Sequence, residues 1–139
     1  MNLVFADTFY FLAIVNRHDA AHARARSVAG ELTDPILTTE WVLTELADAM
    51  SARRVRHLFL RLLEKLQADP NCTIIPATPS LFAEGVKLYA RRSDKEWTLT
   101  DCISFVVMQQ HGISRALTGD RHFEQAGFQA LLSERKNVT

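Results

Sequence analysis

Short apolar runs alternate with longer segments of helical periodicity along this chain. The runs have the length and composition of β-strands, and they cover residues 3–6, 35–39, 72–76, 115–118 and 128–132. In the longer segments apolar side chains recur three and four positions apart, which predicts helices over residues 8–16, 19–32, 40–52, 54–68, 79–92 and 99–111. Gly112 stands where a helix C-cap is expected.

Strands that alternate with longer helices favour an α/β fold of three layers, in which helices flank a short parallel sheet. The sequence contains no internal repeat, no low-complexity segment and no linker. A chain of 139 residues is long enough to bury a substantial core. We therefore expect residues 1–139 to form a single domain.

Composition and charge narrow the class of protein. Hydrophobic residues make up 47% and charged residues 23% of the chain, which is typical of a soluble globular protein. The formal net charge is zero, which argues against nonspecific capture of nucleic acid by the whole surface but allows a local basic patch. Cys72 and Cys102 are not a CxxC pair, and we expect them to be core residues in a reducing compartment.

The N-terminal segment has no basic region before its apolar residues, and Asp7 interrupts the apolar run. A signal peptide is therefore not expected. No apolar run approaches the ~18 residues of a membrane-spanning helix. We expect a cytoplasmic protein without a membrane partner.

Two aspartates follow predicted strands. Asp7 comes directly after the strand at 3–6, and Asp120 follows the strand at 115–118 after one glycine. In open parallel sheets, ligands bind beyond the carboxyl ends of the strands. These two acids are therefore expected at the functional edge of the sheet, although they lie at opposite ends of the sequence.

Two further acids occupy informative positions on helices. Asp101 stands three residues after Thr98, which resembles a capping box in its looser Thr-x-x-Asp form. Glu45 lies three and four residues after Val42 and Trp41, at the border of an apolar face. A carboxylate in such a place is costly unless it is paired or bound to a cation.

Each of these acids, taken singly, also has a purely structural explanation: a turn residue, a helix cap or a surface acid. Taken together, four acids that converge on one point would repel one another, and a divalent cation would relieve the repulsion. A site made only of oxygen ligands selects hard cations such as Mg²⁺ or Mn²⁺ rather than zinc. Such ions bind phosphate oxygens, so the pattern indicates phosphodiester chemistry.

Four stretches carry a resemblance to a known family, and together they run along nearly the whole chain: "FADTFYFLAIVNRHDAAHARA", "TTEWVLTELAD", "DKEWTLTDCISFVVMQQHGI" and "ALTGDRHFEQAGFQAL". The sequence resembles the PIN-domain ribonucleases, which include the VapC-like toxins of bacterial toxin–antitoxin pairs. The resemblance implies a metal-dependent endoribonuclease with a parallel sheet flanked by helices.

The resemblance also implies roles for individual residues. The positions that match the family's catalytic and metal-binding acids are Asp7, Glu45, Asp101 and Asp120. Thr8 and Thr118 match hydroxyl residues that help to arrange that site. In the family, Mg²⁺ or Mn²⁺ activates a water that attacks the RNA backbone and leaves a 5′-phosphate and a 3′-hydroxyl. The implied partners are an RNA substrate, an antitoxin protein and a second copy of the chain in a homodimer.

Several other polar residues receive a structural interpretation. Asp94 is expected to be a solvated loop acid, and His18 with His22 a polar helix face, because no further ligand completes a zinc site. His122, two residues after Asp120, is in a position to touch substrate, but such a histidine more often packs or caps locally.

The only basic cluster lies in the helix at 54–68 and just before it, and it consists of Arg53, Arg54, Arg56 and Arg61. It fits a solvated helix face or a contact with the RNA backbone equally well. In the resembling family, this region also contributes dimer or antitoxin contacts.

Two rival functions remain at this stage. A histidine pair, His111 and His122, would cleave RNA by acid–base catalysis without a metal. Alternatively, the chain is a non-catalytic PIN-fold module that binds RNA or a protein, although such a module needs no carboxylates at all four places.

Overall fold

The computed structural model describes residues 2–134 of the chain. The elements in chain order are β1 (Val4–Ala6), α1 (Thr8–Val15), α2 (His22–Glu31), β2 (Ile36–Thr39), α3 (Glu40–Ala49), α4 (Arg56–Ala68), β3 (Cys72–Ile75), α5 (Pro79–Arg91), α6 (Leu99–Gln110), β4 (Arg115–Leu117), α7 (Arg121–Gln125) and β5 (Gln129–Ala130). The predicted strands and helices are all present, and most differ from the prediction by one to three residues at their ends. α7 was not predicted.

The five strands form one sheet in the order β3-β2-β1-β4-β5, and every neighbouring pair is parallel. The predicted α/β class with a parallel sheet is confirmed. All three residues of β1 are completely buried, which explains why its sequence is an uninterrupted apolar run rather than an alternating one.

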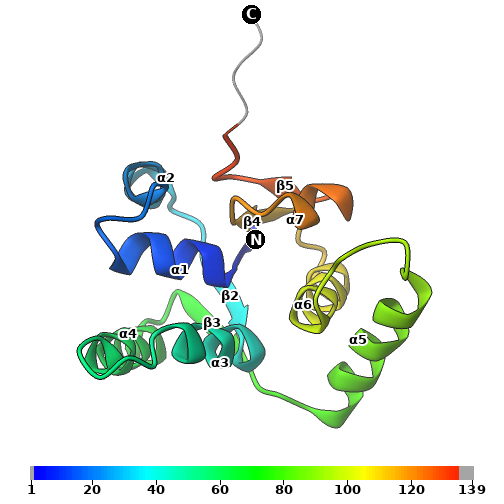
Figure 1. Cartoon of the computed structure of the whole chain (residues 1–139). Coiled ribbons are helices and arrows are strands. Elements are labelled where there is room, and N and C mark those ends of the chain that lie inside the picture. The colour runs from blue at the N-terminus through cyan, green and yellow to red at the C-terminus, as the bar shows by residue number, and fades with distance from the viewer. Residues whose placement is uncertain (1, 135–139) are drawn as a thin grey trace, which may run out of the picture.

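Helices cover both faces of the sheet. In chain order, β2 and β3 are added on one side of β1. β4 and β5 are then added on the other side of β1. Right-handed crossovers place the helices of these two halves on opposite faces. Figure 1 shows α1 to α4 on one side of the sheet and α5 to α7 on the other. The result is the predicted three-layer arrangement.

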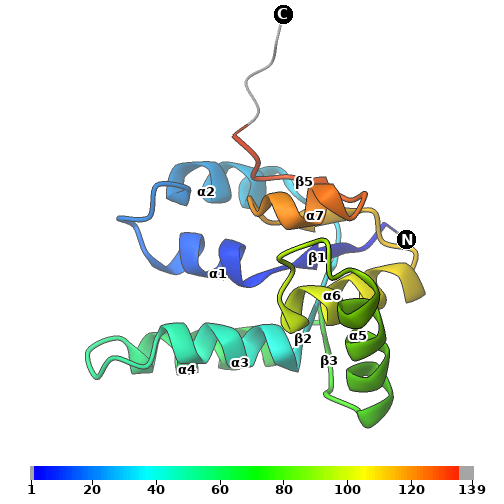
Figure 2. The same cartoon turned by 45° about the vertical axis from the view of Figure 1, so that its right-hand side comes forward.

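α6 is the most deeply buried helix of the second layer. Seven of its twelve residues are buried, and α5 packs directly along it (Figure 2). The contact is close because Gly85 of α5 has no side chain: a Cβ there would come within 2.3 Å of Ile103 Cγ1. α6 ends as predicted, with Gly112 in the left-handed region at φ 63°.

The strand order places a topological switch point between β1 and β4. The chain leaves β1 in one direction along the sheet and enters β4 from the other, so a crevice opens at the carboxyl ends of these two central strands. Asp7 directly follows β1, and Asp120 comes three residues after the end of β4. The fold therefore brings two acids that are 113 positions apart in the sequence to the same edge.

Cys102 is completely buried, and Cys72 is partly buried; neither forms a disulfide. Within residues 2–134, no helix combines the length and the apolar character that crossing a membrane would require.

Candidate metal centre

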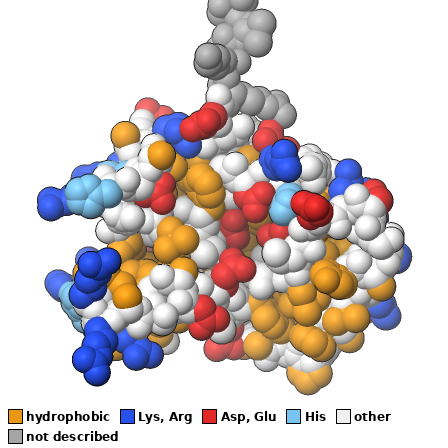
Figure 3. All heavy atoms as spheres, in the orientation of Figure 1, with side chains coloured by type: hydrophobic (Ala, Val, Ile, Leu, Met, Phe, Trp, Pro, Cys, Tyr) orange, Lys and Arg blue, Asp and Glu red, His pale blue; other side chains and the backbone are white. Residues whose placement is uncertain are grey.

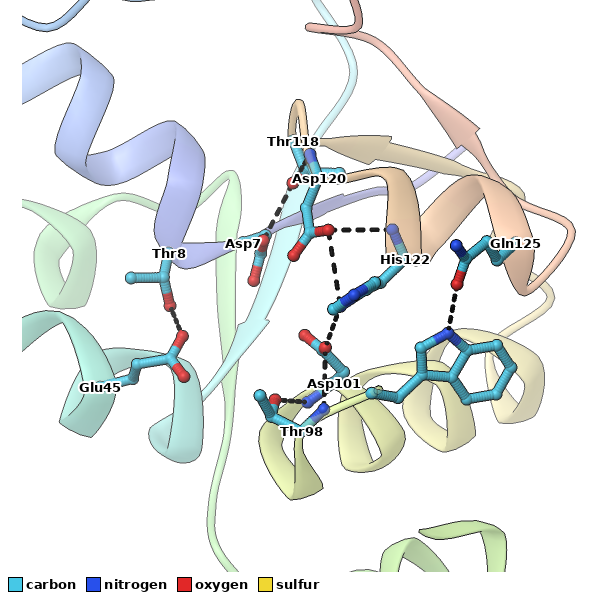
Figure 4. Close-up of polar contacts among 10 residues, drawn as sticks. Asp7, Thr8, Glu45, Thr98, Asp101, Thr118, Asp120, His122 and Gln125 are labelled. Atoms are coloured by element: carbon cyan, nitrogen blue, oxygen red, sulfur yellow. Dashed lines mark hydrogen bonds and ion pairs between the residues drawn. The ribbon is translucent and has the colours of Figure 1, made fainter. Parts of the chain in front are cut away.

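Carboxylates from both helical layers and from the sheet meet at the switch point. Figure 4 shows the side chains of Asp7, Asp101 and Asp120 pointing toward one another. Glu45 of α3 lies beyond Asp7, on the side of the first helical layer. In Figure 3, acidic side chains gather in the middle of the face that carries this cluster.

Asp7 is the most buried of the four acids, with 5% of its surface exposed. It stands at the N-cap position of α1, yet its side chain makes no capping hydrogen bond. Its Oδ2 instead accepts a hydrogen bond from the Thr118 hydroxyl at 2.9 Å. Local capping therefore does not account for this carboxylate.

The surroundings of Asp7 strongly disfavour its charge. Burial raises the pKa of Asp7 to about 7, and the nearby carboxylates of Asp101 and Glu45 add to the increase. Hydrogen bonds from the Thr118 hydroxyl and the Thr8 backbone lower the pKa but do not offset the burial. A cation beside Asp7 would favour the ionised form.

Asp101 has two functions in the structure. The predicted capping box is present: the Thr98 hydroxyl accepts from the Asp101 backbone N–H at 3.0 Å, and Asp101 Oδ2 accepts from the Thr98 N–H at 3.1 Å. The same Oδ2 lies 2.9 Å from His122 Nδ1. Burial raises the pKa of Asp101, as does the charge of Asp120, whereas the contacts with His122 and Thr98 lower it.

Asp120 is the N-cap of α7, where its Oδ1 accepts the backbone N–H of His122 at 2.9 Å. Its own backbone N–H donates to the Thr118 hydroxyl at 3.1 Å. Because the Thr118 hydroxyl also donates to Asp7, this one side chain joins the ends of β1 and β4.

Glu45 is joined to the cluster less directly. Its Oε1 accepts a hydrogen bond from the Thr8 hydroxyl at 2.5 Å. Thr8 follows Asp7 in the chain, so the bond fixes α3 beside the start of α1. Both predicted threonines thus contact acids of the cluster.

Among residues 2–134, one group of side chains has the spacing of a shared metal site: Asp101, Asp120 and His122, with candidate ligand atoms within 4.8 Å of one another. The sequence favours a local packing or capping role for His122, but in the structure its ring contacts Asp101. The only signal in the sequence is its place two residues after Asp120.

The structure also shows where the residues lie that the sequence analysis set aside as metal ligands. Asp94 is exposed and forms two hydrogen bonds with Arg92, at 2.9 and 3.0 Å, outside the cluster. His22 Nδ1 lies 2.7 Å from the backbone oxygen of Ala13, as a structural histidine would. The expectation for Asp94 is confirmed. The shared helix face of His18 and His22 is wrong, because His18 lies exposed in the turn before α2.

The histidine-pair hypothesis is wrong. His111 lies at the C-terminal end of α6, where its Nδ1 contacts the backbone oxygen of Val107. His122 contacts Asp101 in the first turn of the same helix. Asp101 and His111 are ten residues apart on α6, about 15 Å along the helix axis, so the two histidines contact opposite ends of this helix and do not form a pair.

Fold and site together define a parallel α/β protein with a carboxylate cluster at the switch point of its sheet. The chain belongs to the PIN domain family, whose model matches residues 4–129. The resemblance inferred from the sequence is confirmed.

Among proteins of known function, the chain is similar to the 23S rRNA-specific endonuclease VapC20 of Mycobacterium tuberculosis. The two are 26% identical over 126 residues, which cover 91% of this chain and 95% of the relative. The crystal structure of VapC20, described as a sarcin-ricin loop cleaving toxin, matches with a TM-score of 0.81 over 90% of this chain and 95% of that one.

A more distant structure, FitAcB from Neisseria gonorrhoeae, matches with a TM-score of 0.63 at 18% identity. The match covers 91% of this chain and 94% of FitAcB. At this identity the similarity supports the fold alone.

Proposed function

We propose that this protein is a metal-dependent endoribonuclease that hydrolyses RNA phosphodiester bonds. The observation that carries the proposal is the carboxylate of Asp7, which is buried, makes no capping bond and lies beside other acids. A buried carboxylate is costly without a compensating partner, and a divalent cation shared with Asp101 and Asp120 would be such a partner.

The donor set fits a hard divalent ion. The proposed ligands, which are also the proposed catalytic residues, are Asp7, Glu45, Asp101 and Asp120. Carboxylate oxygens suit Mg²⁺ and Mn²⁺. Such an ion supplies Lewis acidity and neutralises charge on the scissile phosphate.

Hydrogen bonds within the chain orient the proposed ligands. The Thr118 hydroxyl holds Asp7 and the backbone of Asp120, and the Thr8 hydroxyl holds Glu45. The N-termini of α1, α6 and α7 all face the cluster, and their partial positive charge favours anions, including an RNA phosphate.

The similarity to VapC20 also suggests a cellular role, a protein partner and an RNA substrate for this protein. We propose a cytoplasmic toxin with an antitoxin protein as partner, and ribosomal RNA as the first substrate to test. We also propose a homodimer. Phe82, Val86 and Tyr89, at i, i+4 and i+7 of α5, are 48%, 39% and 53% exposed and form an apolar strip that a second copy would cover.

The proposal is tested with wild type, Asp7→Asn and, as control, Asp94→Asn, which removes an exposed acid outside the cluster. Each protein is titrated with Mn²⁺ by calorimetry and incubated with purified 23S rRNA, with and without EDTA. We expect Mn²⁺-dependent cleavage by wild type and the control, and a loss of about 100-fold or more in Asp7→Asn.

Cleavage that persists in EDTA, or in Asp7→Asn at the wild-type rate, contradicts the metal mechanism. If wild type neither binds Mn²⁺ nor cleaves any RNA tested, the protein is the non-catalytic PIN-fold module considered above. Circular dichroism of each variant tests whether lost activity comes from unfolding.

A further inference from the structure

His122 contacts two acids of this site, whereas the sequence favours only a local packing or capping role for it. Its side chain is 20% exposed and contacts both Asp101 and Asp120, with Nδ1 at 2.9 Å from Asp101 Oδ2 and 3.6 Å from Asp120 Oδ1. Figure 4 shows the imidazole ring lying between the two carboxylates.

Two contacts made by later residues of α7 fix the position of this helix and of the ring of His122. The next residue, Phe123, is completely buried and packs edge-on against Phe105 of α6, with ring centroids 4.9 Å apart. Further along, Gln125 Oε1 accepts a hydrogen bond from Trp97 Nε1 at 3.0 Å. A helix of only five residues is thereby held against α6 and the segment before it, so the ring of His122 has a defined place.

The contact with Asp101 is a hydrogen bond donated by the histidine. Asp101 Oδ2 already accepts the backbone N–H of Thr98 at 3.1 Å, so it is an acceptor in this arrangement. A hydrogen on Nδ1 makes the 2.9 Å contact favourable, whereas two facing lone pairs would repel. Both donors therefore act on the same carboxylate oxygen, and the other oxygen is turned toward Asp7 and Asp120 (Figure 4).

We infer that His122 is a positioning residue: its Nδ1–H fixes Asp101 Oδ2 so that the second oxygen of Asp101 is presented to the divalent cation. The inference rests on the proposed metal site. The backbone N–H of the same residue holds Asp120 Oδ1 at 2.9 Å, so a single residue orients two of the proposed ligands. Hydrogen bonds to the ligands of a metal typically contribute about 10- to 100-fold in affinity.

The competing role for His122 is direct coordination of the divalent cation by its ring nitrogen. Its ring nitrogen and the Asp101 and Asp120 oxygens lie within 4.8 Å of one another, which would suit three ligands of one ion. Direct coordination by Nδ1 requires that nitrogen to lose its hydrogen and its bond to Asp101. The two roles therefore differ in whether an amide can replace the imidazole and in whether nitrogen binds the ion.

The test uses the full chain and four variants: His122→Ala, His122→Asn, Asp101→Asn and the control His57→Ala. The asparagine amide places an N–H donor near the position of Nδ1, and neither substitution at 122 removes the backbone N–H that holds Asp120. His57 lies exposed on α4, away from the cluster. Mn²⁺ affinity is measured by calorimetry, and nitrogen coordination by pulsed electron paramagnetic resonance of the bound Mn²⁺.

We expect His122→Ala to bind Mn²⁺ about 10- to 100-fold more weakly than wild type, and His122→Asn to recover most of that loss. The control should bind like wild type, and the wild-type spectrum should lack the coupling of a directly coordinated nitrogen. Wild-type affinity in His122→Ala overturns the inference. Equal weakness of the alanine and asparagine variants, or a directly coordinated nitrogen in wild type, also overturns it.

Asp101→Asn separates this inference from the proposed function. If Asp101→Asn loses Mn²⁺ affinity and His122→Ala keeps it, only the role of His122 is wrong. If wild type binds no Mn²⁺, or Asp101→Asn binds it like wild type, the proposed metal site fails and the role of His122 fails with it.

Discussion

Asp7, Asp101 and Asp120 each lie at the start of a helix, but they differ in whether their side chains cap that helix. Asp101 and Asp120 cap α6 and α7, as ordinary structural acids would. Asp7 occupies the same kind of position on α1 without capping it. The sequence predicted helices after Asp7 and around Asp101 but none after Asp120, and only the structure shows that Asp7 makes no capping hydrogen bond.

His122 shows the limit of sequence reasoning at this scale. Its contact with Asp101 joins residues 21 positions apart, and it depends on how α7 packs against α6. No periodicity or short spacing encodes such a contact. Glu45 was easier to select, because a carboxylate at the border of an apolar helix face is visible in the sequence.

Asp7 should make the metal-free protein less stable as the pH rises. Its pKa is about 7 in the folded chain, against an ordinary value of 3.8, so between these values the folded state binds more protons than the unfolded state. The contribution of Asp7 is fully present below pH 4 and is lost as the pH rises through 7. Asp7→Asn should remove this loss and, in EDTA at pH 8, raise the free energy of unfolding by up to about 4 kcal/mol.

Urea denaturation at pH 5 and pH 8 measures this effect, with Asp94→Asn as the exposed-acid control. The pKa of Asp101 is raised as well, so some pH dependence should remain in Asp7→Asn. If wild type and Asp7→Asn lose the same free energy between the two pH values, Asp7 is not the buried acid responsible.

At the scale of elements, the sequence predicted the helices and strands well wherever they were long enough to have a period. α4 and α5, with 13 residues each, were found nearly complete, and the capping box of α6 was read directly from Thr98 and Asp101. α7 was missed because five residues make little more than one turn, too short for a 3.6-residue period to appear.

The packing of α5 against α6 gives a prediction with a matched control. Gly85→Ala should lower the free energy of unfolding by about 1–3 kcal/mol, because the new Cβ meets the buried Ile103 side chain at 2.3 Å. Gly30→Ala, on the exposed side of α2 with no atom within 4 Å of the new Cβ, should instead stabilise the protein by about 0.4–1 kcal/mol.

Urea unfolding midpoints of the two glycine variants measure the difference. Both substitutions change the helix propensity in the same direction, so opposite signs isolate the packing contact. If Gly85→Ala proves as stable as Gly30→Ala, the two helices are not packed as closely as the structure shows.

For the whole molecule, the exposed strip on α5 predicts self-association. Wild type should have twice the 15.7 kDa chain mass in light scattering after size exclusion. Tyr89→Ser should weaken the dimer about 30-fold, because truncating an aromatic side chain that anchors an interface costs about 2 kcal/mol.

Leu60→Ser tests the alternative surface, since Leu60 is 58% exposed on α4, the region that the family resemblance associates with dimer or antitoxin contacts. It should leave the dimer intact. A monomeric wild type, or a dimer disrupted by Leu60→Ser and not by Tyr89→Ser, contradicts the assignment of the dimer surface to α5.

The sequence by itself determined the fold class, most of the elements and the identity of the acids. It could do so because strand and helix periods, caps and turns are local properties of the chain. It also carried the family resemblance, through stretches that keep their order along nearly the whole chain.

Only the tertiary structure decided which side chains meet. The parallel order β3-β2-β1-β4-β5 brings Asp7 and Asp120 to one edge of the sheet, and helices from opposite faces add Glu45 and Asp101. The burial that raises the pKa of Asp7 and the contact of His122 with Asp101 both arise from packing between distant segments. Such contacts depend on the position of every layer at once, and so no local pattern in the sequence specifies them.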